Sequence, residues 1–597
     1  MNRYLPTGNE MISLPKINEE TAGIEDFTYL SMQHKGLIEV RGSDNVPLIQ
    51  PFVRIGENEL PLSQLEWVRE HFWIPTLSAK AGAHDFRMTV LTPVGERGFA
   101  MKLSITGGED AAIVWGLKGC WDSSWHCINE DKQLDGKVHC YPSGWNSSVI
   151  FDFRCGAPVF AFAPMCDQDT NAEYAIAGNS VTYSLSRNDN IRKGQSREIV
   201  FYWGLGYEEV AAATSAKEML RRGWDWEYRR TAAWLDKRSR KMSTPRLTEI
   251  YNTNLFFCIF YSTGITMDTE ELVCATSRGT RYYVSAAYWD RDVLLWAFPA
   301  ILDADSGLAE QILHYIFGRQ RKNLGIHSRY IDGTVLEPGF ELDELMSPVI
   351  ALEAYVAQTG DTDILEDADV RKGIHQILNT LDTMKHPEIA LYETFLQPTD
   401  DEIVHPYLTY NNMLVWRSFN ALAKLYPSKY VSLAQLAQNV KDAIYQHCVF
   451  QDSEGKPYFA WSVDLRGAHN IYDEPPGSLQ LFPYYGFCDA SDAVWQNTVS
   501  MIRSPTYRYS FAGSPIAEIG CAHAPYPWIL SLCNSLLCGH GEQAFRELEL
   551  LDMDNGIACE SVDPVTGACA TGAAFATCAG FLCHSMKRAY EEEFHEK

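Results

Sequence analysis

The stretch SAAYWDRDVLLWAFPAIL, residues 285–302, places two aspartates and an arginine between Trp289 and Trp296 and continues into an apolar segment with helical spacing. A solvated helix start would explain the charges, with Asp292 capping the helix. The floor of a site that grips a polar ligand would explain them equally well. The sequence on both sides of this stretch helps to decide between a helix start and a ligand site.

Apolar residues recur at helical spacing through almost all of the chain from about residue 244. We expect helices at 246–262, 291–303, 306–322, 344–359, 363–382, 410–425, 429–447, 488–503, 526–539, 541–552 and 571–592. A ring of helical hairpins, with two concentric layers of six helices, accommodates this number. In such a ring the loops at one end form the functional site.

The chain from about residue 25 to 208 instead consists of short segments typical of strands, such as GFAMKLSITG and REIVFYWGLG, bounded by turn residues. This pattern favours a β-sandwich. The predicted fold is multidomain: an N-terminal β-sandwich at 1–210, a helical linker at 211–243 and an (α/α)6 barrel, or six-hairpin toroid, at 244–597.

The composition of the chain excludes some classes of binding partner. The formal net charge of −27, without a block of lysine and arginine, argues against nucleic acid and anionic membranes as partners. We find no secretory signal and no apolar run of membrane-spanning length. The 16 cysteines are scattered without metal-ligand spacing, so we expect reduced thiols, a cytoplasmic protein, and neither metal nor cofactor. The sequence leaves the oligomeric state open.

Carboxylates stand beside aromatic, proline or glycine residues in six predicted loops. Any one acid could serve a helix end; Asp343, for example, could interact with the dipole of the following helix. Six such loops in one domain favour a carbohydrate site, because glycoside hydrolysis needs one carboxyl with a raised pKa and a second that is ionised. The six loop segments are 288–292, 327–348, 395–412, 558–575, and two shorter ones that contain Asp473, Glu474, Glu518 and His523.

Five of these motifs also resemble, in the same order, those of the family 125 glycoside hydrolases, which are inverting exo-α-mannosidases with the six-hairpin fold. They are WDRDV (289–293), ELDELMSP (341–348), QPTDDEIVHPYLTYNN (397–412), AEIGCAHAPY (517–526) and CESV (559–562). The segment from Glu560 to Leu582 also resembles the family 63 glucosidases, whose corresponding glutamate is the general base. The sequence departs from the family 125 pattern at Asp290 and Glu344.

The resemblance implies roles for individual residues. The general acid would be Asp400, with Asp401 as the alternate, and the general base would be Glu560. Arg291 and Asp292 would hold hydroxyls of the terminal sugar, with Trp289 as a platform or packing residue and Asp290 as a determinant of sugar specificity. The full set of expected substrate-binding residues is Trp289, Asp290, Arg291, Asp292, Arg329, Glu341, Asp343, Tyr410, Glu518 and His523.

We therefore expect an inverting, exo-acting glycoside hydrolase that cleaves terminal, α-linked sugars from oligosaccharides or glycosides. The sugar itself stays open. A glycoside phosphorylase of similar architecture is the main alternative, in which phosphate would replace the protein base. A polysaccharide lyase would need basic residues for uronate carboxylates, whereas these loops concentrate acids. A non-catalytic carbohydrate-binding protein is the remaining alternative.

Overall fold

The computed structural model describes residues 3–155 and 157–595, which fold into two compact units. The first unit runs to Ser239 and also includes Thr263–Val273 and Arg278–Ala286. The second contains Arg240–Ser262, Cys274–Ser277 and the chain from Ala287 onward. The two segments that return to the first unit lie beyond the boundary at residue 243 that the sequence suggested.

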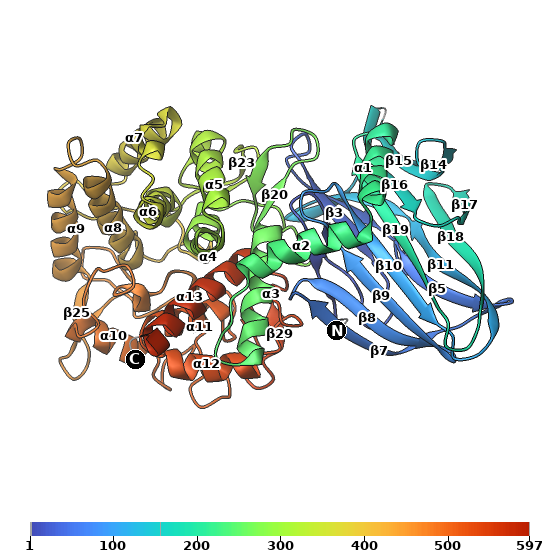
Figure 1. The fold of residues 1–597 in the computed structure, drawn as a ribbon. Coiled ribbons are helices and arrows are strands. Elements are labelled where there is room, and N and C mark those ends of the chain that lie inside the picture. Colours follow the sequence, from blue (N-terminus) through green and yellow to red (C-terminus); the bar gives the residue numbers. More distant parts are fainter. Residues whose placement is uncertain (1–2, 156, 596–597) are drawn as a thin grey trace. The chain divides into compact units, whose positions relative to one another are not determined.

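Three antiparallel sheets build the first unit, and Figure 1 shows β7, β8, β9, β10 and β19 side by side in the largest of them. The six-stranded sheet has the order β1 (Thr7–Gly8), β2 (Ser13–Leu14), β3 (Asp26–Ser31), β4 (Gly36–Arg41), β12 (Ser123–Ile128), β13 (Glu130–Gln133). The eight-stranded sheet has the order β14 (Lys137–Ser143), β15 (Ser148–Cys155), β16 (Ala157–Cys166), β19 (Ser196–Gly206), β10 (Gly98–Thr106), β9 (His84–Leu91), β8 (Ile74–Ala81), β7 (Leu62–Glu70). The five-stranded sheet has the order β17 (Asn171–Ala177), β18 (Ser180–Ile191), β11 (Ala111–Trp121), β5 (Gln50–Ile55), β6 (Asn58–Glu59).

The eight-stranded sheet packs against the other two, which makes the first unit a β-sandwich. Phe27 of β3 stacks on Phe162 of β16 with ring centroids 4.6 Å apart, and Tyr183 of β18 lies 5.9 Å from Trp203 of β19. Such interlocking side chains from facing sheets form the core of a sandwich. The predicted N-terminal β-sandwich is confirmed.

Strand β19 shows why a helix covers the outer face of the eight-stranded sheet. Its odd-numbered residues from Ile199 to Leu205 join the sandwich core, while Val200 and Tyr202 point to the other face and pack against Met219. That face is covered by α1 (Glu209–Arg222), which is followed by α2 (Trp224–Arg238). A Cβ on Gly204 would lie 2.1 Å from the carbonyl oxygen of Ala212, so only glycine lets α1 approach this closely.

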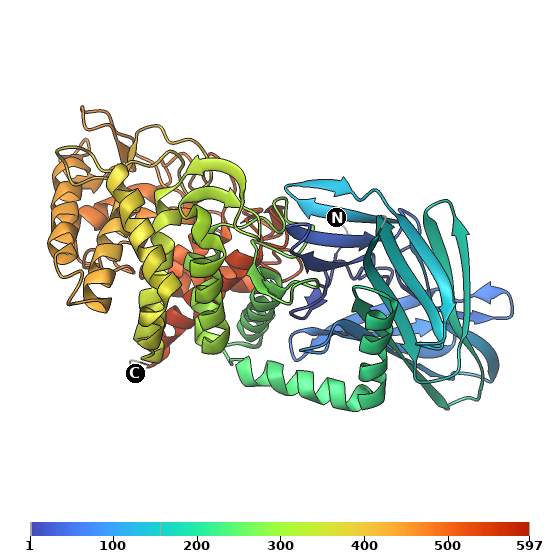
Figure 2. The same ribbon diagram turned by 90° about the horizontal axis from the view of Figure 1, so that it is seen from above.

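The second unit is a ring of helices in two layers (Figure 1). The inner layer contains the π-helix η1 (Arg291–Ala297) continued by α4 (Phe298–Ala304), then α6 (Leu342–Thr359), α8 (Thr409–Leu425), α11 (Ile529–Leu537) and α13 (Ala576–His595). The outer layer contains α3 (Pro245–Ser262), α5 (Ser306–Gly318), α7 (Ala368–Thr383), α9 (Leu433–His447), α10 (Ala493–Ile502) and α12 (Gly541–Leu550). Helices of this unit run side by side in Figure 2. Each of the expected helical segments has an observed counterpart.

The sixth inner position, between α8 and α11, is filled by irregular chain. Short 3₁₀ turns at Pro475–Gly477 (η4) and Leu479–Leu481 (η5) contact α11, and Tyr485 packs on Tyr410 of α8 with ring centroids 6.3 Å apart. Prolines 475, 476 and 483 cannot donate the hydrogen bonds of an α-helix, and glycines 477 and 486 disfavour one. The segment closes the ring without a regular helix.

Short elements complete the two units. The two-stranded ribbons are β20 (Thr263–Ile265) with β21 (Leu272–Cys274), β22 (Ile326–Arg329) with β23 (Val335–Phe340), β24 (Tyr407–Leu408) with β27 (Ser462–Val463), β25 (Val449–Gln451) with β26 (Pro457–Phe459), and β28 (Ser561–Val562) with β29 (Cys569–Thr571). Two further 3₁₀ turns are η2 (Gln320–Asn323) and η3 (Asp363–Glu366).

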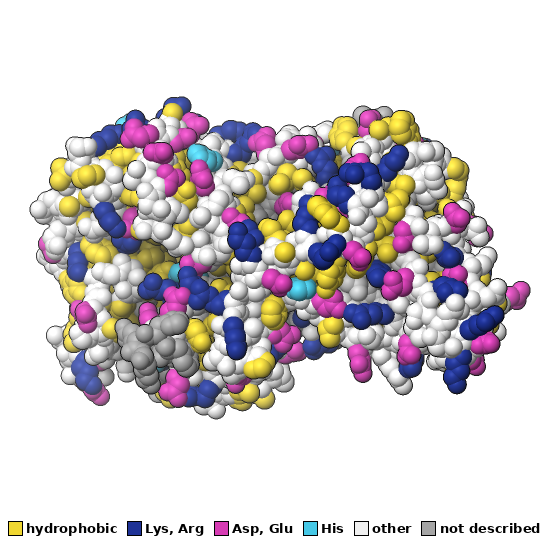
Figure 3. Space-filling model, viewed as in Figure 1, with side chains coloured by type: hydrophobic (Ala, Val, Ile, Leu, Met, Phe, Trp, Pro, Cys, Tyr) yellow, Lys and Arg dark blue, Asp and Glu magenta, His cyan; other side chains and the backbone are white. Residues whose placement is uncertain are grey.

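Two general features accompany this architecture. A helix suited to crossing a bilayer is not found among the described residues, each helix being too short or too polar. On the face drawn in Figure 3, acidic and basic side chains are interspersed.

The close approach at Gly204 yields a stability prediction. Gly204→Ala should lower the free energy of unfolding by about 1–3 kcal/mol, because the new methyl group forces α1 away from β19. Gly144→Ala is the matched control, since nothing lies within 4 Å of a Cβ added there. Thermal unfolding of both variants tests this, and equal melting temperatures would contradict the packing described.

Candidate active site

The loops that carry the predicted site residues meet at one end of the ring. Each precedes an inner element: residues 288–290 lead into η1, 326–341 into α6, 395–408 into α8, 517–528 into α11 and 551–575 into α13. Since inner helices of such a ring run in the same direction, their preceding loops lie together. The contacts described next connect these loops directly.

Arg291 is the centre of this end of the ring. Its guanidinium is buried, with 2% of the side chain exposed, and its Nη1 lies 2.6 Å from Glu341 and 3.3 Å from Asp343. Its Nη2 donates to Asp400 at 2.7 Å and lies 3.5 Å from Asp292. One cation therefore holds carboxylates from η1, α6 and the loop before α8.

Burial makes these carboxylates hard to ionise. It raises the pKa values of Glu341 and Asp343, and Arg291 offsets part of that effect. Burial also raises the pKa of Asp292 to about 7, again partly offset by Arg291. The Asp292 carboxylate accepts a hydrogen bond from Thr577 of α13 at 3.2 Å, which joins the first and last inner elements.

A second arginine lies behind the first. Arg329 and Tyr288 both bond to the Asp290 carboxylate, and the backbone N–H groups of Asp290 and Arg291 donate to Glu344. Asp290 and Arg329 are fully buried. Both residues hold the segment that presents Arg291, and their contact with a substrate stays a prediction.

The helix that begins at Arg291 has a widened turn. The N–H of Phe298 bonds to the carbonyl of Val293, five residues back, as in a π-helix. Pro299 has no N–H to donate to Leu295, so the regular α-helical pattern is already broken at this position. Widened turns of this kind are frequent at functional sites.

Adjacent aspartates in the loop before α8 face different partners. Asp400 adopts the left-handed region with φ of 68°, which costs a non-glycine residue energy, and turns its carboxylate to Arg291. Its N–H donates to the carbonyl of Gln397 at 2.8 Å, which closes the turn. The Asp401 carboxylate instead lies 3.3 Å from His523 and accepts from Thr399 at 3.2 Å. The side chain of Asp400 is 36% exposed.

Glu560 is held by a small hairpin. It immediately precedes β28, and its N–H donates to the carbonyl of Gly572 at 3.1 Å while its carbonyl accepts from Ile529 at 3.1 Å. Thr571 of β29 donates to its carboxylate at 2.6 Å. Glu560 is thus buried at a fixed position between α11 and α13.

His523 connects the two regions electrostatically. Its hydrogen bond with Asp401 raises the pKa of His523 to about 9 against the opposing effect of burial, and the charges of Glu560 and Asp400 raise it further. His523 thus bonds to Asp401, the residue next to Asp400. In return, the hydrogen bond with His523 lowers the pKa of Asp401.

Glu474 is a buried carboxyl that supports the Asp400 loop. It accepts from Thr399 at 2.8 Å and from Tyr472 at 3.1 Å, while its second oxygen has no hydrogen-bond partner among the described residues. Burial raises the pKa of Glu474 to about 8, and the two hydroxyl donors offset only part of this rise.

The remaining predicted residues divide into two groups. Trp289 and Tyr410 are buried beside the Arg291 cluster: the Trp289 indole lies 3.4 Å from His327, and Tyr410 opens α8. Glu518 is buried away from it, accepting from Ser531 and Ser535 of α11 at 2.6 Å each. Glu518 therefore connects its loop to α11, and its contact with a substrate stays a prediction.

His327 is a residue that sequence reasoning missed. It bonds to Glu341 and lies 3.6 Å from Asp400, next to the Trp289 ring. It lies on β22, within the predicted loop segment 327–348. Its place in that acidic segment, two residues before Arg329, was the signal that the sequence offered.

His327, Glu341 and Asp400 could also offer ligand atoms to a metal ion. Arg291 already bonds to both carboxylates of this group, at 2.6 Å and 2.7 Å. Its charge supplies the cation that two neighbouring carboxylates require, so the residues do not fit a metal site well.

Comparison with known proteins agrees with this geometry. The family described as metal-independent alpha-mannosidase (GH125) matches residues 384–586, a range that includes both Asp400 and Glu560. No functionally curated protein matches the sequence.

Similar solved structures show the fold. A bacterial glucoamylase complexed with acarbose covers 99% of this chain and 96% of its own at 12% identity, with a TM-score of 0.65. A protein named as a kojibiose phosphorylase, from the human microbiome, covers 92% and 79% at 11% identity, with a TM-score of 0.59. A metal-independent alpha-mannosidase of Streptococcus pneumoniae, in a non-productive complex with alpha-1,6-mannobiose, covers 58% and 94% at 18% identity, with a TM-score of 0.50. The glucoamylase and the phosphorylase share the fold of nearly the whole chain, whereas the mannosidase matches little more than half of it.

The Arg291 cluster leads to a prediction about stability. Arg291→Met should cost about 3–5 kcal/mol at pH 7, because it leaves buried carboxylates without their cation. The loss should shrink towards pH 5: without Arg291 the folded-state pKa values of Glu341 and Asp343 rise further, so the variant loses stability as pH increases. Arg417→Met, which removes a half-buried ion pair with Glu353 at 2.6 Å, is the control and should change little. A pH-independent difference in melting temperature would contradict this account.

The raised pKa of Glu474 leads to a separate prediction about how stability depends on pH. A carboxyl whose folded pKa is about 8 binds a proton in the folded state that the unfolded state releases at lower pH. Its contribution to stability is therefore greatest near pH 4.5 and is lost as pH rises through 8. Glu474→Gln keeps an acceptor for Thr399 and Tyr472, so it should raise the melting temperature relative to wild type at pH 8.5 more than at pH 5.5. An identical difference at both pH values would show that Glu474 does not titrate in this range.

Proposed function

We propose that this six-hairpin glycosidase-like protein is an exo-acting glycoside hydrolase that removes a terminal, α-linked sugar with inversion at the anomeric carbon. The observation that carries the proposal is geometric: at the end of the ring where Arg291 gathers carboxylates, Asp400 bonds to Arg291 and its neighbour Asp401 lies 3.3 Å from His523, while Thr571 holds Glu560 in the loop before α13. The family match over residues 384–586 supports the same pair.

In the proposed reaction, protonated Asp400 donates its proton to the glycosidic oxygen as the bond to the anomeric carbon breaks. Glu560 takes a proton from water, and the water oxygen bonds to that carbon from the opposite face. Atoms balance: the leaving group departs as an alcohol, and the sugar gains a hydroxyl. Two carboxyls with these separate tasks suffice for an inverting mechanism.

The choice of Asp400 over Asp401 rests on their surroundings. The carboxylate of Asp401 faces His523 rather than the Arg291 cluster. Asp400 lies with Arg291 and His327, in the group that also contains Asp292. We propose that Asp292 and Arg291 bind hydroxyls of the terminal sugar, and that Trp289 and His327 border the same subsite.

Phosphorolysis is the second candidate, and the structural similarity to the kojibiose phosphorylase favours it. A phosphorylase would admit phosphate where the hydrolase admits water. Activity that requires phosphate and releases a sugar phosphate would select it over hydrolysis.

The cytoplasm is the proposed location. All 16 cysteines are free thiols, and most are buried. Thiols persist where the compartment is reducing.

Glu560→Gln should lower kcat by about a hundred- to ten-thousand-fold while substrate binding persists, because the amide keeps the shape but cannot accept the water proton. Glu402→Gln, an exposed carboxylate of the Asp400 loop, should leave kcat unchanged. The assay is a screen of nitrophenyl α-glycosides and α-linked disaccharides. Near-normal turnover by the Glu560 variant would rule out this base.

Asp400→Asn should impair hydrolysis of disaccharides far more than that of dinitrophenyl glycosides, whose leaving group needs little protonation. Asp401→Asn is the matched comparison. If Asp401→Asn alone showed this dependence on the leaving group, the acid would be Asp401.

A further inference from the structure

A recess lies near the loop that carries Asp400, to which its wall is linked through Tyr472 and Glu474. It has a volume of about 690 Å³ and is lined by the hairpin of β25 and β26, the end of α10 and the chain near residues 470–472 and 504–509. These segments follow α9 and α10, and the Asp400 loop follows α7. Cavities of 300–1,000 Å³ are typical of small-molecule sites.

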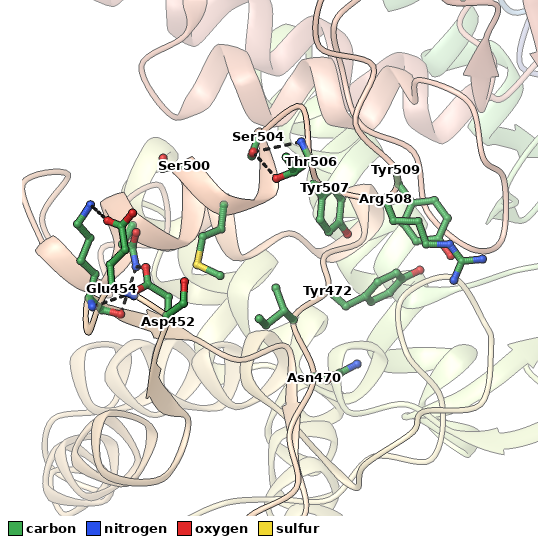
Figure 4. Close-up of a pocket in the computed structure, with 15 residues that line it drawn as sticks. Asp452, Glu454, Asn470, Tyr472, Ser500, Ser504, Thr506, Tyr507, Arg508 and Tyr509 are labelled. Atoms are coloured by element: carbon green, nitrogen blue, oxygen red, sulfur yellow. Dashed lines mark hydrogen bonds and ion pairs between the residues drawn. The ribbon is translucent and has the colours of Figure 1, made fainter.

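Three tyrosines form one side of this recess, which we call the tyrosine pocket: Tyr472, Tyr507 and Tyr509 (Figure 4). The Tyr472 hydroxyl accepts from the N–H of Ala522 at 2.9 Å, and the Tyr507 hydroxyl accepts from the N–H of Asp473 at 3.0 Å. Tyr509 packs edge-to-face on both rings, with centroids 5.8 Å and 6.0 Å away. Two of the hydroxyls are thus fixed within the protein, and the rings form a pre-organised aromatic wall.

The opposite side is polar. Asp452 and Glu454 lie at the far side from the tyrosines in Figure 4, and Lys456 lies 2.8 Å from Glu454. Asn497 donates to Asp452 at 3.1 Å. Arg508, beside Tyr509, is the second basic residue of the lining. Because two acids accompany these two basic residues, the pocket suits a neutral ligand with many hydroxyls better than a phosphate, which needs grouped cations.

Two chains of contacts join the tyrosine pocket to the proposed acid. Tyr472 donates to Glu474, which accepts from Thr399, the residue before Asp400. The Tyr472 ring also lies 5.7 Å from Trp461, whose indole donates to Gln397 at 3.2 Å. Gln397 in turn accepts from the N–H of Asp400. The pocket wall is therefore connected to the Asp400 loop by hydrogen bonds and by one ring contact.

We infer that the tyrosine pocket binds the leaving-group end of an oligosaccharide whose terminal sugar lies at Asp400. The inference rests on the proposed function, because in a glycoside hydrolase the general acid faces the leaving group. Sugar rings stack on aromatic faces, and the polar wall offers partners for their hydroxyls. Longer substrates should gain affinity here, while a substrate with a single sugar does not reach the pocket.

Tyr509→Ala tests the inference, because its ring can be removed without breaking the hydrogen bonds to Glu474. The measured quantity is the ratio of kcat/KM for a trisaccharide to that for the nitrophenyl monosaccharide. The probes are α-1,6-linked mannotriose with nitrophenyl α-mannoside, and maltotriose with nitrophenyl α-glucoside. We expect the ratio to fall about three- to tenfold, the effect of one lost ring contact. Tyr509→Phe keeps the ring and should retain the ratio.

Ser500→Trp provides an independent variant should Tyr509→Ala fold poorly. Ser500 is an exposed residue of α10 that lines the pocket, so an indole there would fill the space from the other side. The same fall in the ratio is expected. An unchanged ratio in folded variants of both kinds overturns the tyrosine pocket as a sugar site and leaves the proposed function standing. A wild-type protein that cleaves none of the probes overturns the proposed function and this inference with it.

Discussion

A buried guanidinium among carboxylates is the constraint on which the second unit depends. Arg291 contacts Glu341, Asp343 and Asp400, and each of these charges would be unfavourable at its position without a partner. Because the carboxylates come from separate hairpins, their shared cation fixes the loops relative to one another. The ring can open at this end only by separating buried charges.

This arrangement also explains why acidic loops converge there without repelling one another. Arg329 neutralises Asp290 behind Arg291, and His523 interacts with Asp401, Asp400 and Glu560 on the other side. Among the carboxylates that contact Arg291, Asp400 is the partly exposed one. Structural stability and the proposed chemistry therefore depend on the same interactions.

Periodicity alone predicted the helices of the second unit, because their buried faces repeat every three to four residues. It could not predict the sixth inner position, where prolines 475, 476 and 483 prevent a helix. The sequence shows the charges of Asp290 and Arg329, but it does not show that both are buried and bonded to each other. His327 was missed for the converse reason, as its importance comes from contacts with Glu341 and Asp400 across the fold. The return of Thr263–Val273 to the first unit had no sequence signal.

Product stereochemistry tests the central claim most directly. Hydrolysis of an α-linked substrate that the protein cleaves, α-1,6-mannobiose or maltose, can be followed by proton NMR from the first minutes, before the anomers equilibrate. The account predicts that the β-anomer of the released terminal sugar forms first. Initial release of the α-anomer would show retention and contradict the assignment of Asp400 and Glu560 as the acid and base of a single displacement.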